Sequence, residues 1–270
     1  MPNKKDKNRF YFNKDFLGSP EGRSVRILSE YYGPLKSIKN NKINDTIVFF
    51  GSARIKSEKE AKEILSNLNN SASDQARKKA QNDIKMSKYY EDARQLAKKL
   101  TIWSKKLDDK KSRYIITSGG GGGIMEAANR GAKEANGISV GLTISLPFEA
   151  TSNEYISRGL DLKFHYFFMR KFWFIYLAKA LVVWPGGFGT LDEVMELLTL
   201  IQTEKIKKKL PIVLYGSEFW NNVVNWNYLV ECGTISESDL DLFHISNDVN
   251  DSYDYIIKYL KEYRLAGPNF

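Results

Sequence analysis

Cysteine and histidine are scarce in this 270-residue sequence, and their scarcity excludes two kinds of site. The single cysteine, Cys232, has no partner for an intrachain disulfide, which suits a reducing compartment. The two histidines, His165 and His244, are far apart and lack neighbours at the spacing of metal ligands. We therefore expect neither a disulfide framework nor a metal site.

Long apolar runs are also missing from the chain. No run approaches the roughly 18 apolar residues that a membrane-spanning helix needs. Residues 1–9 are polar and basic, unlike a secretory signal. We expect a cytoplasmic protein with no membrane partner. The length suits one substantial core and no Pro/Gly/Ser-rich linker divides it, so we predict a basic, mobile tail over 1–22 and a single domain over 23–270.

Acidic residues are in deficit, since 41 Lys and Arg oppose 32 Asp and Glu and give a formal net charge of +9. The excess lies in residues 1–9 and in 56–111, where 15 basic and 9 acidic residues occur. A basic chain can bind nucleic acid. Here, however, acids are mixed among the lysines, and aromatic residues are not interleaved as stacking platforms. The stronger interpretation is a solvated surface, so we expect a charged helical insertion around 57–88 and no nucleic-acid partner.

Apolar runs alternate with helix-forming segments along the chain. Buried strands are predicted near 46–50, 114–117, 139–144, 180–184 and 211–215, the last of which closes the sheet. This alternation predicts an α/β fold, namely a Rossmann-like, doubly wound, mainly parallel sheet with helices on both faces. A helix over 24–38 is expected to be interrupted near Gly33-Pro34. After an extended aromatic run, Arg170 and Lys171 are expected to open a helix over 171–179.

Glycines gather at predicted strand ends. Residues 185–193, Pro-Gly-Gly-Phe-Gly-Thr-Leu-Asp-Glu, join a strand to a helix, and 119–123 is a run of five glycines at a second such junction. Glycines let a phosphate approach the backbone, and a helix N-terminus offers unpaired N–H groups. A third turn, 51–54, adds a serine hydroxyl and a guanidinium group. The five-glycine run fits neither the dinucleotide fingerprint nor a P-loop, and each turn can also be a plain strand–helix connection.

Three charged residues beside these turns allow more than one interpretation. Arg170 and Lys171 are adjacent cations in an apolar context, so they either pair with buried carboxylates or hold an anionic ligand. Glu193 follows Thr190 by three residues, which leaves two hypotheses open. The two residues can form a capping box that serves the helix, or Glu193 can be a catalytic carboxylate, and one residue can fill both roles.

The segments 118–132 (SGGGGGIMEAANRGA), 167–171 (FFMRK) and 185–193 (PGGFGTLDE) together resemble the LOG (Lonely Guy) family, long labelled possible lysine decarboxylases. The family's P-G-G-x-G-T-x-x-E pattern is fully matched. The resemblance implies a Rossmann-like homodimer or higher homo-oligomer that hydrolyses the N-glycosidic bond of a nucleoside 5′-monophosphate, either a cytokinin riboside monophosphate or AMP. It also implies that Arg170 and Glu193 are the catalytic pair. The five glycines and the 57–88 region depart from the family pattern.

The candidate contacts of the substrate and its phosphate combine the glycine turns with neighbouring residues: Ser52, Gly120, Gly121, Gly122, Met169, Lys171, Gly186, Gly187, Gly189 and Thr190. Cleavage of a ribosyl N–C bond passes through an oxocarbenium-like transition state, which a carboxylate stabilises while it orients water. We expect Glu193 to supply that carboxylate, and Arg170 to orient it or to bind ribose or phosphate oxygens. This chemistry calls for no metal or redox cofactor.

Other functions stay open at this point. A non-catalytic nucleotide-binding carrier or sensor would keep the glycine turns without needing Arg170 and Glu193 together. A pyridoxal-phosphate decarboxylase would need a Schiff-base lysine, and nothing marks Lys171 as desolvated. The base is not identified, because four apolar residues suit either pocket walls or core: Phe148, Phe168, Met169 and Trp173.

Overall fold

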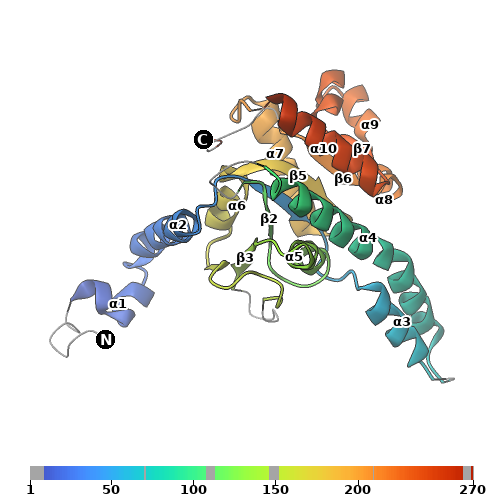
Figure 1. Cartoon of the computed structure of the whole chain (residues 1–270), viewed down its shortest axis with the longest axis horizontal. Helices are drawn as coiled ribbons and strands as arrows, with labels where there is room; N and C mark the ends of the chain where they lie inside the picture. The colour runs from blue at the N-terminus through green and yellow to red at the C-terminus, as the bar shows by residue number, and fades with distance from the viewer. Residues whose placement is uncertain are drawn as a thin grey trace.

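The computed structural model describes residues 9–69, 71–107, 113–145, 152–208, 210–263 and 269. Within these ranges a seven-stranded sheet has the order β4-β3-β2-β1-β5-β6-β7, and every neighbouring pair is parallel (Figure 1). The strands are β1 (Thr46–Phe50), β2 (Ile115–Ser118), β3 (Ser139–Ile144), β4 (Asp161–Phe164), β5 (Ala178–Val183), β6 (Ile212–Tyr215) and β7 (His244–Ser246). The predicted α/β, doubly wound, Rossmann-like fold is confirmed.

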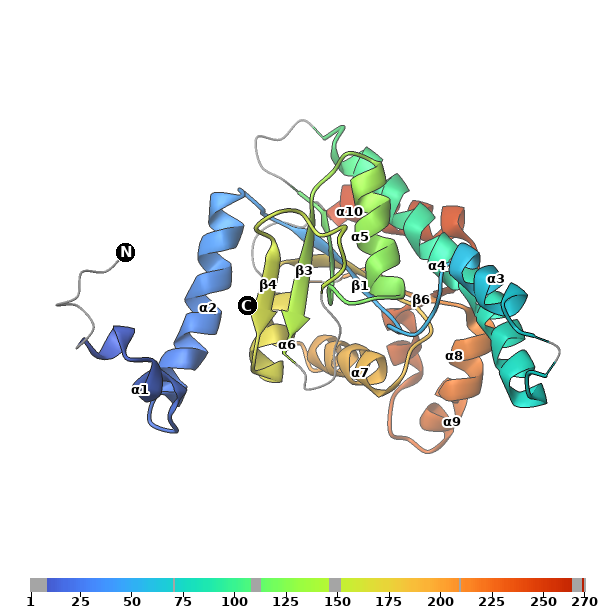
Figure 2. The same ribbon diagram turned by 90° about the horizontal axis from the view of Figure 1, so that it is seen from below.

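Helices cover both faces of the sheet (Figures 1 and 2). On one face α4 and α5 pack against each other and against β2, and α10 packs on α4 and on β5, β6 and β7. On the other side lie α6, which packs on β3 and β4, and α7 (Figure 2). The helices are η2 (Phe10–Phe12), α1 (Lys14–Gly18), α2 (Arg23–Asn40), α3 (Glu58–Ser66), α4 (Asp74–Ser104), α5 (Ile124–Glu134), α6 (Phe167–Tyr176), α7 (Phe188–Gln202), α8 (Ser217–Val223), α9 (Trp226–Glu231), η3 (Glu237–Leu242) and α10 (Val249–Tyr263).

The core lies along the central strands. Every residue of β1, β2, β3, β5 and β6 is buried, as expected of parallel strands that are covered on both faces. Trp184 and Tyr215 are among the largest fully buried side chains, and their ring centroids are 4.1 Å apart. This packing fixes the positions at which the central strands end, and hence the turns that follow them.

β1 lies at the centre of the sheet, where the direction of chain progression reverses. From β1 the chain adds β2, β3 and β4 on one side, and then returns to add β5, β6 and β7 on the other. Ligands of doubly wound sheets bind at the carboxyl ends of the strands beside such a reversal. The turns after β1, β2 and β5 are therefore the place to look for a site.

The edges of the sheet differ from the sequence prediction. The sheet does not close at β6, because β7 follows it, and β4 forms the opposite edge. β4 alternates exposed and buried residues, and β7 has only three residues. Neither is a continuous apolar run of the kind that predicted the other strands. The charged region around 57–88 forms a helical hairpin of α3 and the first part of α4, which projects from the body (Figure 1).

The N-terminal helices also differ from the sequence prediction. α2 runs without interruption from Arg23 to Asn40, although Pro34 lies inside it. Proline has no N–H, so the carbonyl of Glu30 loses its helical partner. The indole N–H of Trp173 donates to this carbonyl at 2.9 Å instead, which explains how α2 tolerates the proline. Residues 10–18 of the predicted tail form η2 and α1, and 1–8 lie outside the described residues.

Among the described helices, none combines the length and the apolar character needed to cross a membrane.

Candidate active site

The turns after β1, β2 and β5 are joined through the backbone of Ser52. Its N–H donates to the carbonyl of Pro185 at 3.1 Å, and its own carbonyl accepts from the N–H of Ile124 at 3.1 Å. Its Oγ accepts a hydrogen bond from the N–H of Arg54, also at 3.1 Å. The three turns predicted from the sequence therefore meet at the carboxyl end of the sheet, with Ser52 between the other two.

The glycine run after β2 has a conformation that larger residues cannot adopt. Gly120 has a φ of +74° and Gly123 a φ of +62°, in the left-handed region that favours glycine. A Cβ at Gly120 would also press against the side chain of Thr143 and lie 3.3 Å from the Cα of Gly141. Gly121 and Gly122 remain partly exposed. The run thus brings backbone close to any ligand above it.

Two asparagines hold this glycine run in place. The side-chain amide of Asn153 donates to the carbonyls of Gly120 at 3.0 Å and Gly121 at 2.9 Å. The same amide donates to Oδ1 of Asn129 at 3.0 Å, and that oxygen also accepts from the Ser118 hydroxyl at 2.7 Å. Asn129 is fully buried. A satisfied buried network of this kind fixes the turn before any ligand arrives.

The turn after β5 leads into a bare helix N-terminus. α7 has Gly187 as its N-cap residue, and no side chain of the described chain caps its first turn. A Cβ at Gly186 would overlap the Thr190 side chain, so this position requires glycine. α5 likewise starts after Gly123 without a side-chain cap. Two neighbouring helix N-termini with unpaired N–H groups suit an anion such as phosphate.

Arg170 reaches the glycine run from α6. A Cβ at Gly119 would lie 2.5 Å from Nη2 of Arg170, so the guanidinium group covers this glycine directly. Its Nε donates to the carbonyl of Leu142 at 2.7 Å, and its central carbon lies 5.1 Å from the ring centroid of the buried Phe174. A carbonyl and an aromatic face therefore hold the cation over the turn.

Glu193 lies in the second turn of α7, because the helix begins at Phe188. Thr190 is then inside the helix and cannot be its N-cap residue. The capping-box hypothesis for Thr190 and Glu193 is therefore wrong. Thr190 is buried and packs against Gly186 instead, so helix capping does not account for the carboxyl group of Glu193.

The pKa of the Glu193 carboxyl group is higher than that of an ordinary glutamate. Burial raises the pKa of Glu193 from 4.5 to about 7, although the positive charges of Arg170 and Lys171 oppose the rise. Asp192 and Glu196 add to it through like-charge repulsion. The influence of Arg170 shows that the two predicted catalytic residues lie within electrostatic range. A carboxyl group with a pKa near neutrality can exchange a proton at physiological pH.

Two predicted substrate contacts have other surroundings in the structure. Lys171 forms ion pairs with Asp192 at 2.7 Å and Glu196 at 3.0 Å, so its ammonium group ties α6 to α7. The pKa of Lys171 is raised; burial lowers it, and these two carboxylates more than compensate. Met169 is buried in the core. Their contacts with substrate stay predictions.

Several residues of the site were missed from the sequence. Asn129 and Asn153 support the glycine run, and Leu142 and Phe174 position Arg170. Of these, only Asn129 could have been recognised from the sequence, because it is a polar residue among the apolar positions of a helix. Phe148, proposed as a pocket wall, lies outside the described residues, whereas Phe168 is exposed and Trp173 buried.

The fold defines a Rossmann-like α/β protein, in which two glycine turns and two helix N-termini meet at the carboxyl end of the sheet. Residues 125–256 match the family model described as "Possible lysine decarboxylase". This description is that of the LOG family domain, so the resemblance predicted from the sequence is confirmed over these residues. No curated protein matches the chain.

Solved structures similar to this chain include the molybdenum cofactor binding protein from Rippkaea orientalis, at 16% identity over 82% of this chain and 98% of that one, with a TM-score of 0.45. Another is the molybdenum cofactor carrier protein from Chlamydomonas reinhardtii, at 19% identity over 80% and 98% of the two chains, with a TM-score of 0.45. A third is a structural genomics target, TM1055, at 20% identity over 79% and 99%, with a TM-score of 0.46.

Proposed function

We propose that the protein hydrolyses the N-glycosidic bond of a nucleoside 5′-monophosphate, releasing the free base and ribose 5-phosphate. The observation that carries the proposal is the carboxyl group of Glu193, which burial brings to a pKa of about 7 close to Arg170. Such a group is poised for proton transfer, and a purely structural residue of α7 would not need it. The match to the LOG family supports the same reaction class.

The substrate's 5′-phosphate is proposed to bind at the adjoining N-termini of α5 and α7. Gly121, Gly122, Gly187 and Gly189 supply the close backbone there, and all four are at least partly exposed. Thr190 and Ser52 fix the shape of the turns through their own contacts. Because Glu193 lies one turn into α7, a phosphate at the helix start brings the attached ribose toward its carboxylate.

The reaction breaks the bond between C1′ of the ribose and a ring nitrogen of the base. As that bond lengthens, positive charge develops on the ribose, and the Glu193 carboxylate stabilises it. A water molecule adds its hydroxyl group to C1′, while the leaving nitrogen takes up a proton. In this scheme Glu193 accepts the proton of the water, and this proton is returned through solvent to the leaving nitrogen, which restores the carboxylate. Arg170 keeps the carboxylate charged in its buried surroundings, because its positive charge favours the ionised form.

A pyridoxal-phosphate decarboxylase is not supported by the residues near the glycine turns. A Schiff-base lysine must lose its proton to react, and this requires a lowered pKa. Lys171 has the opposite property, since its two carboxylate partners raise its pKa. We therefore do not propose decarboxylation as the activity of this chain.

Self-association and a cytoplasmic location belong to the proposal as well. Three phenylalanines near the site are unusually exposed, with Phe188 at 92% and Phe167 and Phe168 at 54% each. An exposed apolar group of this size favours contact with another protein surface. We propose that a second copy of the chain covers it, which light scattering coupled to size-exclusion chromatography tests directly. Fractionation of the native cells tests the location.

Incubation with a panel of nucleoside monophosphates tests the reaction. We expect equal amounts of free base and ribose 5-phosphate from at least one member, with AMP and isopentenyladenosine monophosphate as the first substrates to try. The same nucleoside without its 5′-phosphate is the matched control, and it should react much more slowly. Tight binding of a nucleotide without any release of base would contradict hydrolysis and favour a non-catalytic carrier or sensor.

A further inference from the structure

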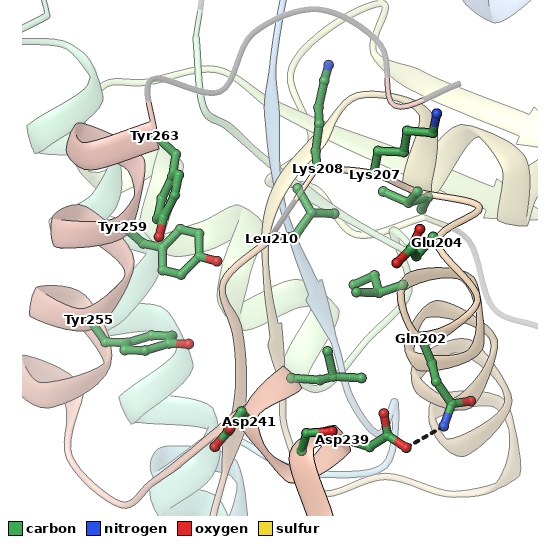
Figure 3. Close-up of a pocket in the computed structure, with 14 residues that line it drawn as sticks. Gln202, Glu204, Lys207, Lys208, Leu210, Asp239, Asp241, Tyr255, Tyr259 and Tyr263 are labelled. Carbon is green, nitrogen blue, oxygen red and sulfur yellow. Dashed lines mark hydrogen bonds between the residues drawn. The ribbon is translucent and has the colours of Figure 1, made fainter. Parts of the chain in front are cut away.

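A cavity lies at the opposite end of α7 from Glu193. It has a volume of about 710 Å³ and is lined by the end of α7, residues 204–208 and 210, η3 and α10. The end of α7 leads into β6, and η3 leads into β7. The cavity is therefore at the amino end of these strands, away from the glycine turns. Figure 3 shows its lining. None of these residues takes part in the proposed hydrolysis.

One wall of this cavity is a row of tyrosines on α10. Tyr255, Tyr259 and Tyr263 are spaced four residues apart, which places them on one helix face, and all three point into the cavity (Figure 3). Their ring centroids are 6.1 Å and 4.5 Å apart in succession. Tyr255 is held by His244, whose ring stacks on it at 4.5 Å. The opposite wall carries apolar side chains: Ile201, Ile206 and Leu210.

Carboxylates also line the cavity. Glu204 lies across it from Tyr259, and Asp239 and Asp241 lie at its foot (Figure 3). Asp239 is held by the Gln202 side chain at 2.6 Å and by the N–H of Ser236 at 2.8 Å. Lys207 and Lys208 also line the cavity, but in Figure 3 their ammonium groups point away from the tyrosines. The interior therefore presents negative charge, in a chain whose net charge is +9.

Glu204 has a left-handed backbone conformation, with a φ of +57°. It follows the last turn of α7, where its N–H donates to the carbonyl of Ile201 at 3.0 Å. Such a conformation is common at a helix end, and Lys42 after α2 and Asn136 after α5 have it as well. The turn places Glu204 on the lining of the cavity, with its carboxylate directed inward (Figure 3).

We propose that this cavity binds an aliphatic diamine or polyamine. An ammonium group at each end would meet Glu204 and Asp241, and the methylene chain between them would lie between the tyrosine rings and the apolar wall. Phenol rings attract cations through their faces, and carboxylates do so through charge. Phosphorylated and carboxylate ligands are disfavoured, because the interior carboxylates repel them.

Calorimetric titration of the full-length protein with 1,4-diaminobutane and with spermidine tests this site. Saturable binding is expected, and 1-aminobutane, which has only one ammonium group, should bind at least about tenfold more weakly. Added salt should weaken the diamine. A lack of saturable binding at millimolar diamine would overturn the proposal, and so would equal affinity for the monoamine.

Three variants locate the binding. Glu204→Gln should weaken the diamine at least about tenfold, whereas Glu237→Gln, an exposed acid of η3 outside the lining, should leave the affinity unchanged. Glu204→Gly should abolish most of the binding and at the same time raise the thermal midpoint, because glycine relieves the left-handed strain. Unchanged affinity in both Glu204 variants would overturn the assignment, and a folded, more stable Glu204→Gly excludes misfolding as the cause of lost binding.

Discussion

The two ends of the parallel sheet each carry a cation and a carboxylate, and their surroundings differ. At the carboxyl end Arg170 acts on Glu193 beside the glycine turns. At the amino end Lys179 of β5 lies 3.7 Å from Asp45, which precedes β1, and both side chains are fully buried. The same kinds of charged group thus serve a candidate reaction at one end and the packing of the sheet at the other.

Asp45 and Lys179 at the amino end, which we call the closed pair, have several hydrogen-bond partners. Nε of Arg113 donates to Asp45 at 2.6 Å, and the Asn44 side chain donates to the same oxygen at 3.1 Å. The ammonium group of Lys179 donates to the carbonyl of Ala178 and to the Asn269 side chain, each at 3.3 Å. Burial still lowers the pKa of Lys179 to about 8. Oδ2 of Asp45 therefore accepts two hydrogen bonds, whereas its buried Oδ1 has no hydrogen-bond partner among the described residues and faces the Lys179 ammonium group at 3.7 Å.

Arg170 and Glu193 at the carboxyl end, which we call the open pair, differ in the surroundings of the carboxylate. Among the described residues, none donates a side-chain hydrogen bond to the Glu193 carboxyl group, and the turns beside it are made of glycine. What separates the two ends is therefore the set of side chains that donate to the carboxylate. Asp45 is fully buried and accepts from Arg113 and Asn44, whereas the pKa of Glu193 is shifted toward neutrality, which makes proton transfer possible.

The largest expected effect follows substitution of the open carboxylate. Glu193→Gln should lower the hydrolysis rate by about 10³-fold, because the amide can neither stabilise the ribosyl cation nor accept a proton. The variant should be at least as stable as the parent protein at pH 8. The raised pKa of Glu193 means that its stabilising contribution is present at low pH and is lost as pH rises from 4.5 through about 7.

Rates of base release and thermal midpoints at pH 5 and pH 8 measure both effects. The stability gain of Glu193→Gln over the parent should be larger at pH 8 than at pH 5. Full turnover in this variant would contradict the catalytic assignment, and a stability loss at both pH values would make Glu193 a packing residue like Asp45.

The next effect concerns the cation of the open pair. Arg170→Ala should lower the rate by about 10²-fold. It should also raise the pKa of Glu193 further, because the charge of Arg170 opposes the effect of burial. A carbon-13 NMR titration of labelled glutamate follows that pKa without any need for turnover. An unchanged or lower pKa in the variant would mean that the two residues are not coupled.

The sequence predicted the parts of the fold and site that depend on long, regular patterns. Five strands lie within continuous apolar runs and were found close to their positions. The glycine turns were found because plain strand–helix connections are seldom so rich in glycine. Arg170 and Glu193 came from the family motif.

The features that were missed depend on tertiary contacts. Thr-Leu-Asp-Glu has the spacing of a capping box, so nothing local revealed that α7 begins two residues before Thr190. The aromatic run 164–169 favours an extended segment, and Phe164 does end β4, but 167–169 join α6, where Met169 and Trp173 are buried. Asn153 is distant in sequence from the glycine run that it holds, so no local pattern marks it.

The closed pair should respond in stability and not in rate. Asp45→Asn removes the charge that Arg113 and Lys179 share, so it should lower the free energy of unfolding by about 3 kcal/mol. Lys179→Met should be neutral or stabilising, because Asp45 keeps its contact with Arg113. Urea denaturation measures both effects, and kcat should be unchanged in the folded fraction.

The pH dependence of stability distinguishes the contribution of Lys179 from those of the neighbouring charged groups. Its pKa falls from 10.5 to about 8 on folding, so the unfolded chain binds the proton more tightly and stability from this group rises as pH increases from about 8 to 10.5. Lys179→Met should remove this rise. A rise of the same size in the variant would assign it to another group.

The smallest expected effect concerns Lys171, which stands between the two kinds of pair. It lies next to Arg170 in the sequence, but its ammonium group is satisfied by Asp192 and Glu196 in the manner of the closed end. Lys171→Met should therefore change the equilibrium constant of unfolding by a factor of no more than about five, the range of a partly exposed ion pair. The KM for a nucleoside monophosphate should change by no more than about the same factor. The pKa of Glu193 should rise slightly, because the charge of Lys171 lowers it. An increase in KM well beyond that range, with no increase for a substrate lacking the phosphate, would instead make Lys171 a phosphate ligand and would add it to the open end of the sheet.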